Sequence, residues 1–587
     1  MPDPPTFALP IIILIILGYL VYRRRLSPSI SDLPGPQPES FLLGTTSAAP
    51  QALVCSPRAP GSLPEFQQGQ VGVAEFKWAA QYGDVYRVKG ILGTERLFVA
   101  DPKAIHHIHH LASYNIRKQE LRAELSRVFT GPGLSYVEGE AHKRQRRINS
   151  PAFGTMDARS YIPIFLSYAS STLPAILRGF FFDAIGEVAF DYRFGTTDNL
   201  NSEHPLSTAL NSVLPQMYTP PTKKTIFIFG LLELLPAWLM RLYMHHAPTA
   251  GLRNSRRVEK IATDLARELV AAKSEEIAAG KRKRDIMSLL VKANLSENPR
   301  TSLTEDEMLA QMQTIMQAGQ ETTAVTLSWT LFELTQHRDV QNKLRAEIQA
   351  TERAIRERGE TQFTWSDFEA MPYTIAVMKE TLRYHPVAYN NTREAARDEV
   401  LPLSNPITTR SGKILTELPI RKHQVIVVSV AAYNRNTQIF GADAGHFNPE
   451  RWLDDTVKPL APLGVYGNLY LVFDDLRKWT SSMHRSTHGL SVFRVLTSHL
   501  QVTVWRRPSA LYCVATESDH DRIYEYQSFL VELVKNFAFT MDPATAQQLR
   551  RQASLVMLPM LPGKVGPHMP LQVAPIDAVE QCFVFKT

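Results

Sequence analysis

The chain has 587 residues, of which 44% are hydrophobic and 21% are charged, and its formal net charge is +7. This length excludes a small stapled scaffold, and its three cysteines cannot form a disulfide framework. The ordinary composition excludes bulk disorder, and the mild, locally clustered positive charge gives no reason to expect a nucleic-acid partner.

The first predicted element is an N-terminal membrane anchor at Phe7–Tyr22. This apolar run is followed at once by Arg23, Arg24 and Arg25, which favours a cytosolic location for the rest of the chain. A cleaved signal peptide is the alternative, but it would carry basic residues before the apolar run and small residues at its end. The charge order therefore favours an uncleaved, single-pass anchor over residues 1–25, in contact with membrane lipid.

A hinge and an irregular insert follow at residues 26–65. Leu33–Pro38 has proline at alternate positions, which predicts a stiff extended spacer because proline fixes φ and cannot continue a helix. Residues 45–64 are rich in Ala, Pro and Ser and have no clear periodicity. They are typical of a loop, or of an error in the gene model.

The remainder of the chain, residues 66–587, has mainly helical periodicity. Apolar residues recur three and four positions apart over long stretches, for example at Val258–Ala279. Short β-like runs occur at Asp84–Val88, Arg96–Val99 and His423–Val430. We therefore expect one large, mainly α domain with small β-sheets, in addition to the N-terminal transmembrane helix.

A long predicted helix begins at the capping box Thr304–Glu307 and carries Ala-Gly-Gln-Glu-Thr-Thr at residues 318–323. Glycine inside a helix costs about 1 kcal/mol relative to alanine, so Gly319 indicates a close approach, such as that of a flat ligand. Glu321 and Thr322 place an acid beside a hydroxyl, a pair that is able to bind a small polar molecule or relay protons. The alternative is an exposed Glu–Thr pair beside a chance glycine.

A second pattern combines one acid with two arginines. Glu380 and Arg383 share a helix face, and Pro386 soon ends that helix. Arg451 lies in an irregular segment, Phe447–Trp452, and is able to complete a Glu–Arg–Arg cluster with bidentate geometry. The alternative is a solvated surface ion pair.

A third pattern is a basic helix at Gly139–Arg147. His142 and Arg146 are four residues apart and therefore face one way along it. Cationic donors at this spacing suit a ligand that bears carboxylates. A basic, solvated helix face is the alternative.

Taken together, the order and spacing of these motifs resemble the cytochrome P-450 superfamily of haem-thiolate monooxygenases, in its membrane-anchored fungal form. The resemblance covers Leu33 to about Asp454 and resumes from Tyr526–Leu530 to about Val573. It implies a cytochrome P-450-like fold with haem b as the cofactor.

The resemblance also implies the roles of residues in the long helix. Ala318 and Gly319 would lie against the face of the haem. Glu321 and Thr322 would be catalytic, because the acid and the threonine of this helix deliver protons during oxygen activation in the family.

The other motifs would hold the cofactor and the fold around it. His142 and Arg146 would match the helix that binds the haem propionates. Glu380, Arg383 and Arg451 would match the structural lock that the family carries behind the haem.

The sequence does not contain the haem-ligand loop of the family. The family pattern is Phe-x-x-Gly-x-Arg-x-Cys-x-Gly, and its thiolate donates electron density to the iron. Between Asp474 and Asp521 the sequence has one cysteine, Cys513, without the glycines or the arginine of the pattern. Cys513 is therefore disfavoured as the metal ligand, the axial ligand is unknown, and residues 470–525 form an aberrant segment.

A shifted reading frame restores the pattern. Trp and Met have one codon each, every Thr codon begins with A and every His codon begins with C. One nucleotide forward, Trp479 must therefore become Gly and Met483 must become Cys, while Leu476, Ser481 and Arg485 are able to become Phe, Arg and Gly. We interpret the segment as a frame-shifted, intron-retaining translation of a normal loop, in which Met483 marks the register of the expected ligand.

We therefore expect a monooxygenase that oxidises a small hydrophobic molecule, in fungal secondary metabolism or xenobiotic oxidation, from the cytosolic face of the endoplasmic reticulum membrane. Electrons would come from an NADPH-cytochrome reductase, because the chain has no flavin or dinucleotide fingerprint. The basic stretch His142–Arg147 would serve its docking. The alternatives are a haem-free, inactive relic or mis-translated isoform that keeps the fold as a binding protein, and a helical scaffold unrelated to haem, which the ordered motifs disfavour.

Overall fold

The computed structural model describes residues 30–37, 63–153, 155–171, 177–195, 204–206, 220–280, 285–294, 302–453, 457, 520–554, 556–564 and 566–576. The predicted anchor, most of the insert and the positions of Met483 and Cys513 lie outside these residues. In the part of the chain that is described, no helix has the length and apolar character needed to cross a bilayer.

Helices form most of the described structure, as the periodicity predicts. The α-helices are α2 Leu63–Gln68, α3 Val73–Tyr82, α4 Pro102–His106, α5 Glu120–Thr130, α6 Gly139–Asn149, α7 Thr155–Ser171, α8 Leu177–Phe190, α10 Lys223–Leu232, α11 Ala237–His246, α12 Ala250–Ala278, α13 Ile286–Asn294, α14 Glu305–Gln336, α15 Arg338–Glu357, α16 Trp365–Glu369, α17 Pro372–Tyr384, α18 Val430–Tyr433, α19 Thr437–Phe440, α21 His520–Asn536 and α22 Pro543–Gln548. A π-helical turn, η2, spans His107–Leu111, and 3₁₀ turns span Ile91–Gly93 (η1), Ser150–Phe153 (η3) and Pro449–Trp452 (η5).

The strands form one five-stranded sheet, in the order β1-β2-β7-β4-β3, and three two-stranded sheets, β5–β6, β8–β11 and β9–β10. In the large sheet β2 and β7 are parallel, and the other neighbours are antiparallel. The strands are β1 Val85–Lys89, β2 Glu95–Val99, β3 Ile116–Lys118, β4 Asn390–Ala395, β5 Glu399–Thr408, β6 Ile414–Ile420, β7 Val425–Ser429, β8 Phe537–Thr540, β9 Arg550–Gln552, β10 Leu558–Met560 and β11 Gln572–Pro575. The three predicted β-like runs are confirmed, because they correspond to β1, β2 and β7.

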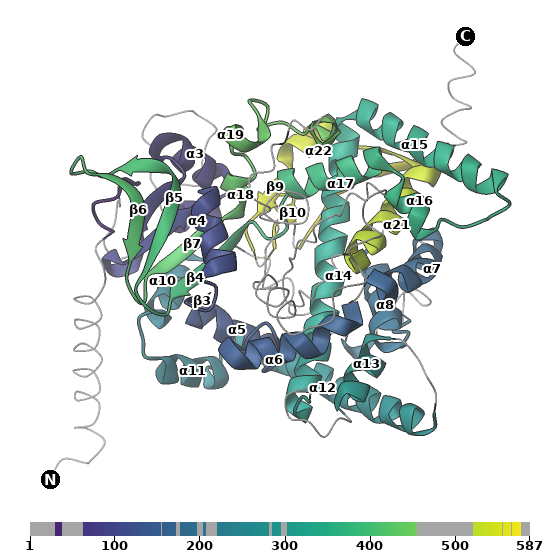
Figure 1. Cartoon of the computed structure of the whole chain (residues 1–587), viewed down its shortest axis with the longest axis horizontal. Helices are drawn as coiled ribbons and strands as arrows, with labels where there is room; N and C mark the ends of the chain where they lie inside the picture. The colour runs from purple at the N-terminus through teal and green to yellow at the C-terminus, as the bar shows by residue number, and fades with distance from the viewer. Residues whose placement is uncertain are drawn as a thin grey trace, which may run out of the picture.

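The long helix α14 runs through the middle of the molecule, with strands β3 to β7 on one side and helices α7, α8, α15 and α21 on the other (Figure 1). Its start confirms the predicted capping box: the backbone N–H of Glu307 donates to Oγ1 of Thr304 at 3.2 Å, and Oε2 of Glu307 accepts from the backbone N–H of Thr304 at 3.0 Å. This exchange satisfies two groups that a helix N-terminus leaves unpaired. The predicted helix at Val258–Ala279 corresponds to the later part of α12. The observed helix begins earlier, at Ala250, because the Thr249 side chain caps it.

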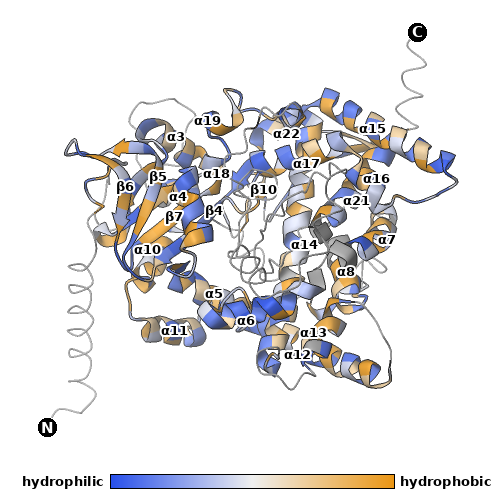
Figure 2. Ribbon diagram, in the orientation of Figure 1, coloured by the Kyte–Doolittle hydropathy of each residue, from blue (hydrophilic) through white to orange (hydrophobic). Residues whose placement is uncertain are grey.

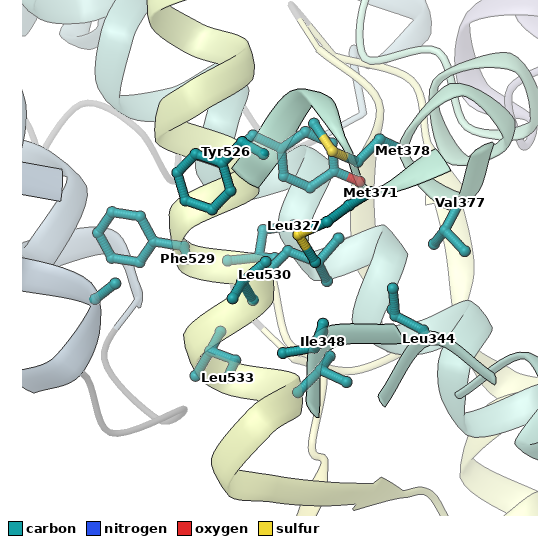
Figure 3. Packing of buried hydrophobic residues seen from close by; sticks show 14 of the residues in the cluster. Leu327, Leu344, Ile348, Met371, Val377, Met378, Tyr526, Phe529, Leu530 and Leu533 are labelled. Carbon is teal, nitrogen blue, oxygen red and sulfur yellow. The ribbon is translucent and has the colours of Figure 1, made fainter. Parts of the chain in front are cut away.

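The largest apolar cluster on the helical side holds α21 against its neighbours. Helix α21 packs against α7 and α14, and its apolar face meets side chains from α14, α15 and α17. This packing fixes α21 beside the middle of α14. Figure 3 labels ten members of the cluster: Leu327, Leu344, Ile348, Met371, Val377, Met378, Tyr526, Phe529, Leu530 and Leu533.

One carboxyl group is buried at the start of α3. Glu75 is 1% exposed, and its Oε2 accepts from the backbone N–H of Gly72 at 3.1 Å. Its Oε1 has no hydrogen-bond partner in the described part of the chain. Burial raises the pKa of Glu75 to about 7, and the nearby Arg551 opposes this shift only in part.

We expect Glu75→Gln to stabilise the fold more at pH 8 than at pH 5. Because the folded pKa of Glu75 lies above the ordinary value of 4.5, its contribution to stability is lost as pH rises towards about 7. Glutamine mimics the neutral acid, so the gain in free energy of unfolding at pH 8 should approach about 3 kcal/mol. Thermal unfolding of both proteins across this pH range tests the prediction, which an equal gain at pH 5 would contradict.

Candidate functional site

The carboxylate of Glu380 joins two arginines in the interior. Arg383 donates from Nε to Oε2 at 2.8 Å and from Nη2 to Oε1 at 2.7 Å, and Arg451 donates from Nε to Oε1 at 3.1 Å. The side chains of Glu380 and Arg383 are 0% exposed, and that of Arg451 is 3% exposed. The surface ion pair is therefore the wrong alternative, and the structure brings the three predicted residues together.

This lock also ties backbone segments together. The remaining capacity of the Glu380 carboxylate is taken by the backbone N–H of Asn448 at 2.7 Å and by the indole N–H of Trp452 at 2.9 Å. Helix α17 is thereby fixed to residues 434–452, which would hold the chain behind a bound cofactor. Arg383 donates in addition to three backbone carbonyls at 2.7–2.8 Å, those of Asn434, Ala444 and His446.

The middle of α14 carries the predicted acid and hydroxyl. Oγ1 of Thr322 donates to the carbonyl oxygen of Ala318 at 2.8 Å, which orients the hydroxyl along the helix. Glu321 and Thr322 are both half-buried, so neither is a fully exposed residue of a solvated face. Their catalytic role stays a prediction.

Close packing of two helices explains the glycine at position 319 in this fold. A Cβ atom at this position would come within 2.6 Å of Cγ1 and 2.8 Å of Cδ1 of Ile185 on α8. The glycine therefore lets α8 pack closely on α14. This packing does not test the predicted contact of Ala318 and Gly319 with the haem, which stays a prediction.

Helix α6 is mostly hydrophilic (Figure 2), yet its two predicted ligand-binding residues are buried. His142 is 5% exposed and Arg146 is 8% exposed, whereas Lys143 and Arg147 on the same helix are exposed. A basic, solvated helix face therefore describes Lys143 and Arg147 but not His142 and Arg146.

The surroundings of His142 disfavour the cationic form of its ring. Burial and then the positive charges of Lys118, Arg146 and Arg393 hold the pKa of His142 well below its ordinary value of 6.5. The spacing along the helix predicts that His142 faces the same way as Arg146. The pKa of its ring, however, depends on burial and on cations that other segments bring to it.

Arg393 on β4 is one residue of this site that the sequence reasoning missed. It is 4% exposed, and its charge acts on the buried rings of His109 and His142. An arginine on a strand has no motif of its own. Only the pairing of β4 with β3 and β7 brings it to α6, so the sequence offered no signal for it.

Glu525 on α21 is a second missed residue. It is 1% exposed, and its Oε2 accepts from Oγ1 of Thr323 at 2.9 Å, next to the predicted catalytic Thr322. The sequence offered no clear signal for it, because the residues before Tyr526 are mostly polar or charged and do not mark Glu525 as buried.

A long central helix with an acid–threonine pair, a buried Glu–Arg–Arg lock and a buried group of basic side chains agree with the class of haem-dependent oxidoreductases that the resemblance implies. The family model for cytochrome P450 matches residues 59–464, which is more than half of the chain. The chain belongs to the cytochrome P450 family.

Characterised fungal relatives give the activity class. The chain is 30% identical to cytochrome P450 monooxygenase claU of Ampulloclitocybe clavipes, over 78% of this chain and 82% of that protein. It is 28% identical to cytochrome P450 monooxygenase 91 of Postia placenta, over 78% of this chain and 85% of that protein. It is also 28% identical to ganoderic acid synthetase CYP5150L8 of Ganoderma lucidum, over 80% of this chain and 87% of that protein. The protein is accordingly a monooxygenase-type oxidoreductase.

Membership of the family implies haem b as the cofactor. The donor set on α6 and β4 fits the propionate end of this group, because the charged groups that act on buried His142 are all cations: Lys118, Arg146 and Arg393. Two carboxylates would neutralise this buried positive charge. The cysteines Cys55, Cys513 and Cys582 lie outside the described residues, so the fit concerns the propionate end.

We expect Glu380→Ala to lower the free energy of unfolding by about 3–5 kcal/mol, because it leaves the guanidinium of Arg383 buried without its carboxylate, whereas Arg451 keeps its pair with Asp443 at 2.8 Å. The matched control is Lys343→Ala, which breaks the exposed pair between Lys343 and Glu450 at 2.6 Å. Denaturant unfolding of each variant gives the measurement. Equal effects of the two substitutions would contradict a structural lock at Glu380.

Proposed function

We propose that this protein is a membrane-anchored haem monooxygenase that inserts one oxygen atom of O₂ into a small hydrophobic molecule, with electrons from NADPH through a separate reductase. The observation that carries the proposal is the buried set of donor side chains His142, Arg146 and Arg393, in a chain whose α14 bears an acid and a hydroxyl. Haem, when bound, supplies the one-electron and oxygen chemistry that amino-acid side chains lack.

The residues of the chain have three tasks in this proposal. His142 and Arg146 bind and orient the propionates. Glu321 and Thr322 hold and move protons at the carboxylate and at Oγ1, and the bond from Thr322 to Ala318 orients that hydroxyl.

The names of the relatives support the substrate class. One of them is a ganoderic acid synthetase, and all those described above are fungal proteins. We propose a small hydrophobic substrate from fungal secondary metabolism or a xenobiotic of similar character.

Two features support a location on the endoplasmic reticulum membrane with the domain in the cytosol. The first is the apolar sequence Phe7–Tyr22 with its following arginines. The second is α11, where Trp238 and Leu242, four residues apart, are 65% and 51% exposed and lie on one face of the helix. Exposed Lys143 and Arg147 on α6 suit the docking of an acidic surface of the reductase.

We also propose that the aberrant segment at residues 470–525 replaces a normal haem-ligand loop through a shifted frame. The forced changes at Trp479 and Met483 support this reading. The match to the family model ends at residue 464, before the segment begins, which agrees with it. The second candidate function is a haem-free relic or mis-translated isoform that keeps the fold as a binding protein, and the absence of the family's cysteine pattern favours it for the chain as printed.

Reading the transcript and recording a spectrum test both proposals. We expect the main transcript to encode the Phe-x-x-Gly-x-Arg-x-Cys-x-Gly loop, and its product to give a thiolate-type Soret band in the reduced, CO-bound difference spectrum. The chain as printed should give no such band. A stop codon inside the shifted loop would contradict the frame hypothesis. A thiolate-type band from the printed chain would exclude the relic, and Cys513→Ser would then test the ligand.

We expect Thr322→Ala to uncouple oxygen reduction from product formation in the haem-loaded protein that the corrected reading frame encodes. Loss of the hydroxyl should lower the product formed per NADPH by about ten-fold or more, because proton delivery loses a positioned donor. Ser328→Ala is the matched control, since Oγ of Ser328 donates to the carbonyl of Ala324 at 2.8 Å on the same helix. Unchanged coupling in Thr322→Ala would remove this residue from the proton relay.

A further inference from the structure

The ring of His142 has a hydrogen-bond partner that none of the sequence motifs includes. The hydroxyl of Tyr114 lies 3.2 Å from Nδ1 of His142, and the two rings meet edge to face with centroids 6.1 Å apart. Tyr114 lies between the π-helical turn η2 and strand β3. In the described part of the chain, this is the hydrogen bond that the His142 ring makes.

The direction of this hydrogen bond follows from the charges around it. Burial and the cations Lys118, Arg146 and Arg393 lower the pKa of His142 and so favour the ring that carries one proton. A neutral imidazole has one N–H and one acceptor nitrogen, and its hydrogen-bond partner decides which is which.

Tyr114 is placed to be the donor of this pair. Nζ of Lys143 lies 4.7 Å from the centroid of the Tyr114 ring. A cation at this distance stabilises negative charge on the phenol and so favours the hydroxyl as a donor. Nδ1 of His142 then accepts, and the ring proton resides on Nε2.

We propose that Tyr114 is a positioning residue that holds His142 in the Nε2–H tautomer, so that this N–H donates to a carboxylate of the cofactor. The proposal rests on the haem-binding role proposed for His142. The opposite tautomer would turn a lone pair towards the carboxylate and would repel it. A neutral donor also complements Arg146 and Arg393, because it adds a hydrogen bond without adding to the buried positive charge.

The first measurement reads the tautomer without any cofactor. Full-length protein labelled with ¹⁵N-histidine gives ring-nitrogen shifts by NMR, and His142→Gln identifies the signals of His142. We expect the Nε2–H form in the unmodified protein, and a mixture of forms or rapid exchange in Tyr114→Phe. An Nδ1–H form in the unmodified protein, or an unchanged tautomer in Tyr114→Phe, would overturn the proposal.

The second measurement is the rate at which the haem-loaded protein loses haem to an excess of haem-free globin. We expect Tyr114→Phe to lose haem about ten-fold faster, because the N–H of His142 is then no longer held towards a carboxylate of the haem. Tyr136→Phe is the matched control, because its hydroxyl donates to Glu124 at 3.4 Å and Arg127 lies over its ring, 5.3 Å from the centroid. Tyr114→Phe should have no further effect in the His142→Gln background.

The two measurements separate failure of this proposal from failure of its premise. If His142→Gln speeds haem loss but Tyr114→Phe does not, His142 binds the cofactor and Tyr114 does not position it. If neither substitution changes haem loss, the haem-binding role of His142 is wrong and the proposal falls with it, whatever tautomer the NMR shows.

Discussion

A single buried carboxylate sets the organisation of the chain after α17. Glu380 has no exposed surface, so it requires compensation from groups that come to it, and these are two guanidiniums, one backbone N–H and one indole N–H. Arg383 in turn donates to three backbone carbonyls of residues 434–446, and Arg451 pairs with Asp443 at 2.8 Å. A stretch with little regular structure of its own is therefore fixed to α17 by side-chain bonds.

The second constraint is the close packing around α14. Its capping box fixes where the helix starts, and Gly319 lets α8 approach it closely. Helix α21 is bonded to α14 by polar side chains, Thr323 with Glu525 and Thr330 with Tyr526. The helix that bears the acid and the hydroxyl is thus held by packing and by buried hydrogen bonds, an arrangement suited to chemistry that needs fixed proton donors.

Sequence reasoning succeeded where function depends on local spacing. The Thr304 capping box, the pairing of Glu380 with Arg383 and the shared face of His142 and Arg146 all follow from positions three or four apart on a helix. It also placed Arg451 with the lock, because the resemblance to a known family supplied a contact over a long distance.

It failed where tertiary contacts decide the chemistry. The lowered pKa of His142 depends on its burial and on the charges of Lys118 and Arg393, which reach it from two different strands. The packing reason for Gly319 required Ile185 of another helix. Periodicity along the chain contains none of these distances, and the residues that set them have no motif of their own.

The residues on either side of the stretch between Leu453 and His520 are each held by contacts of their own. One end is held by the lock on Glu380, and the other by the contacts of α21 with α14. The contacts that secure each end are made by residues outside this stretch. The positions of both ends are therefore set by parts of the chain that the sequence motifs identify, whatever sequence joins them.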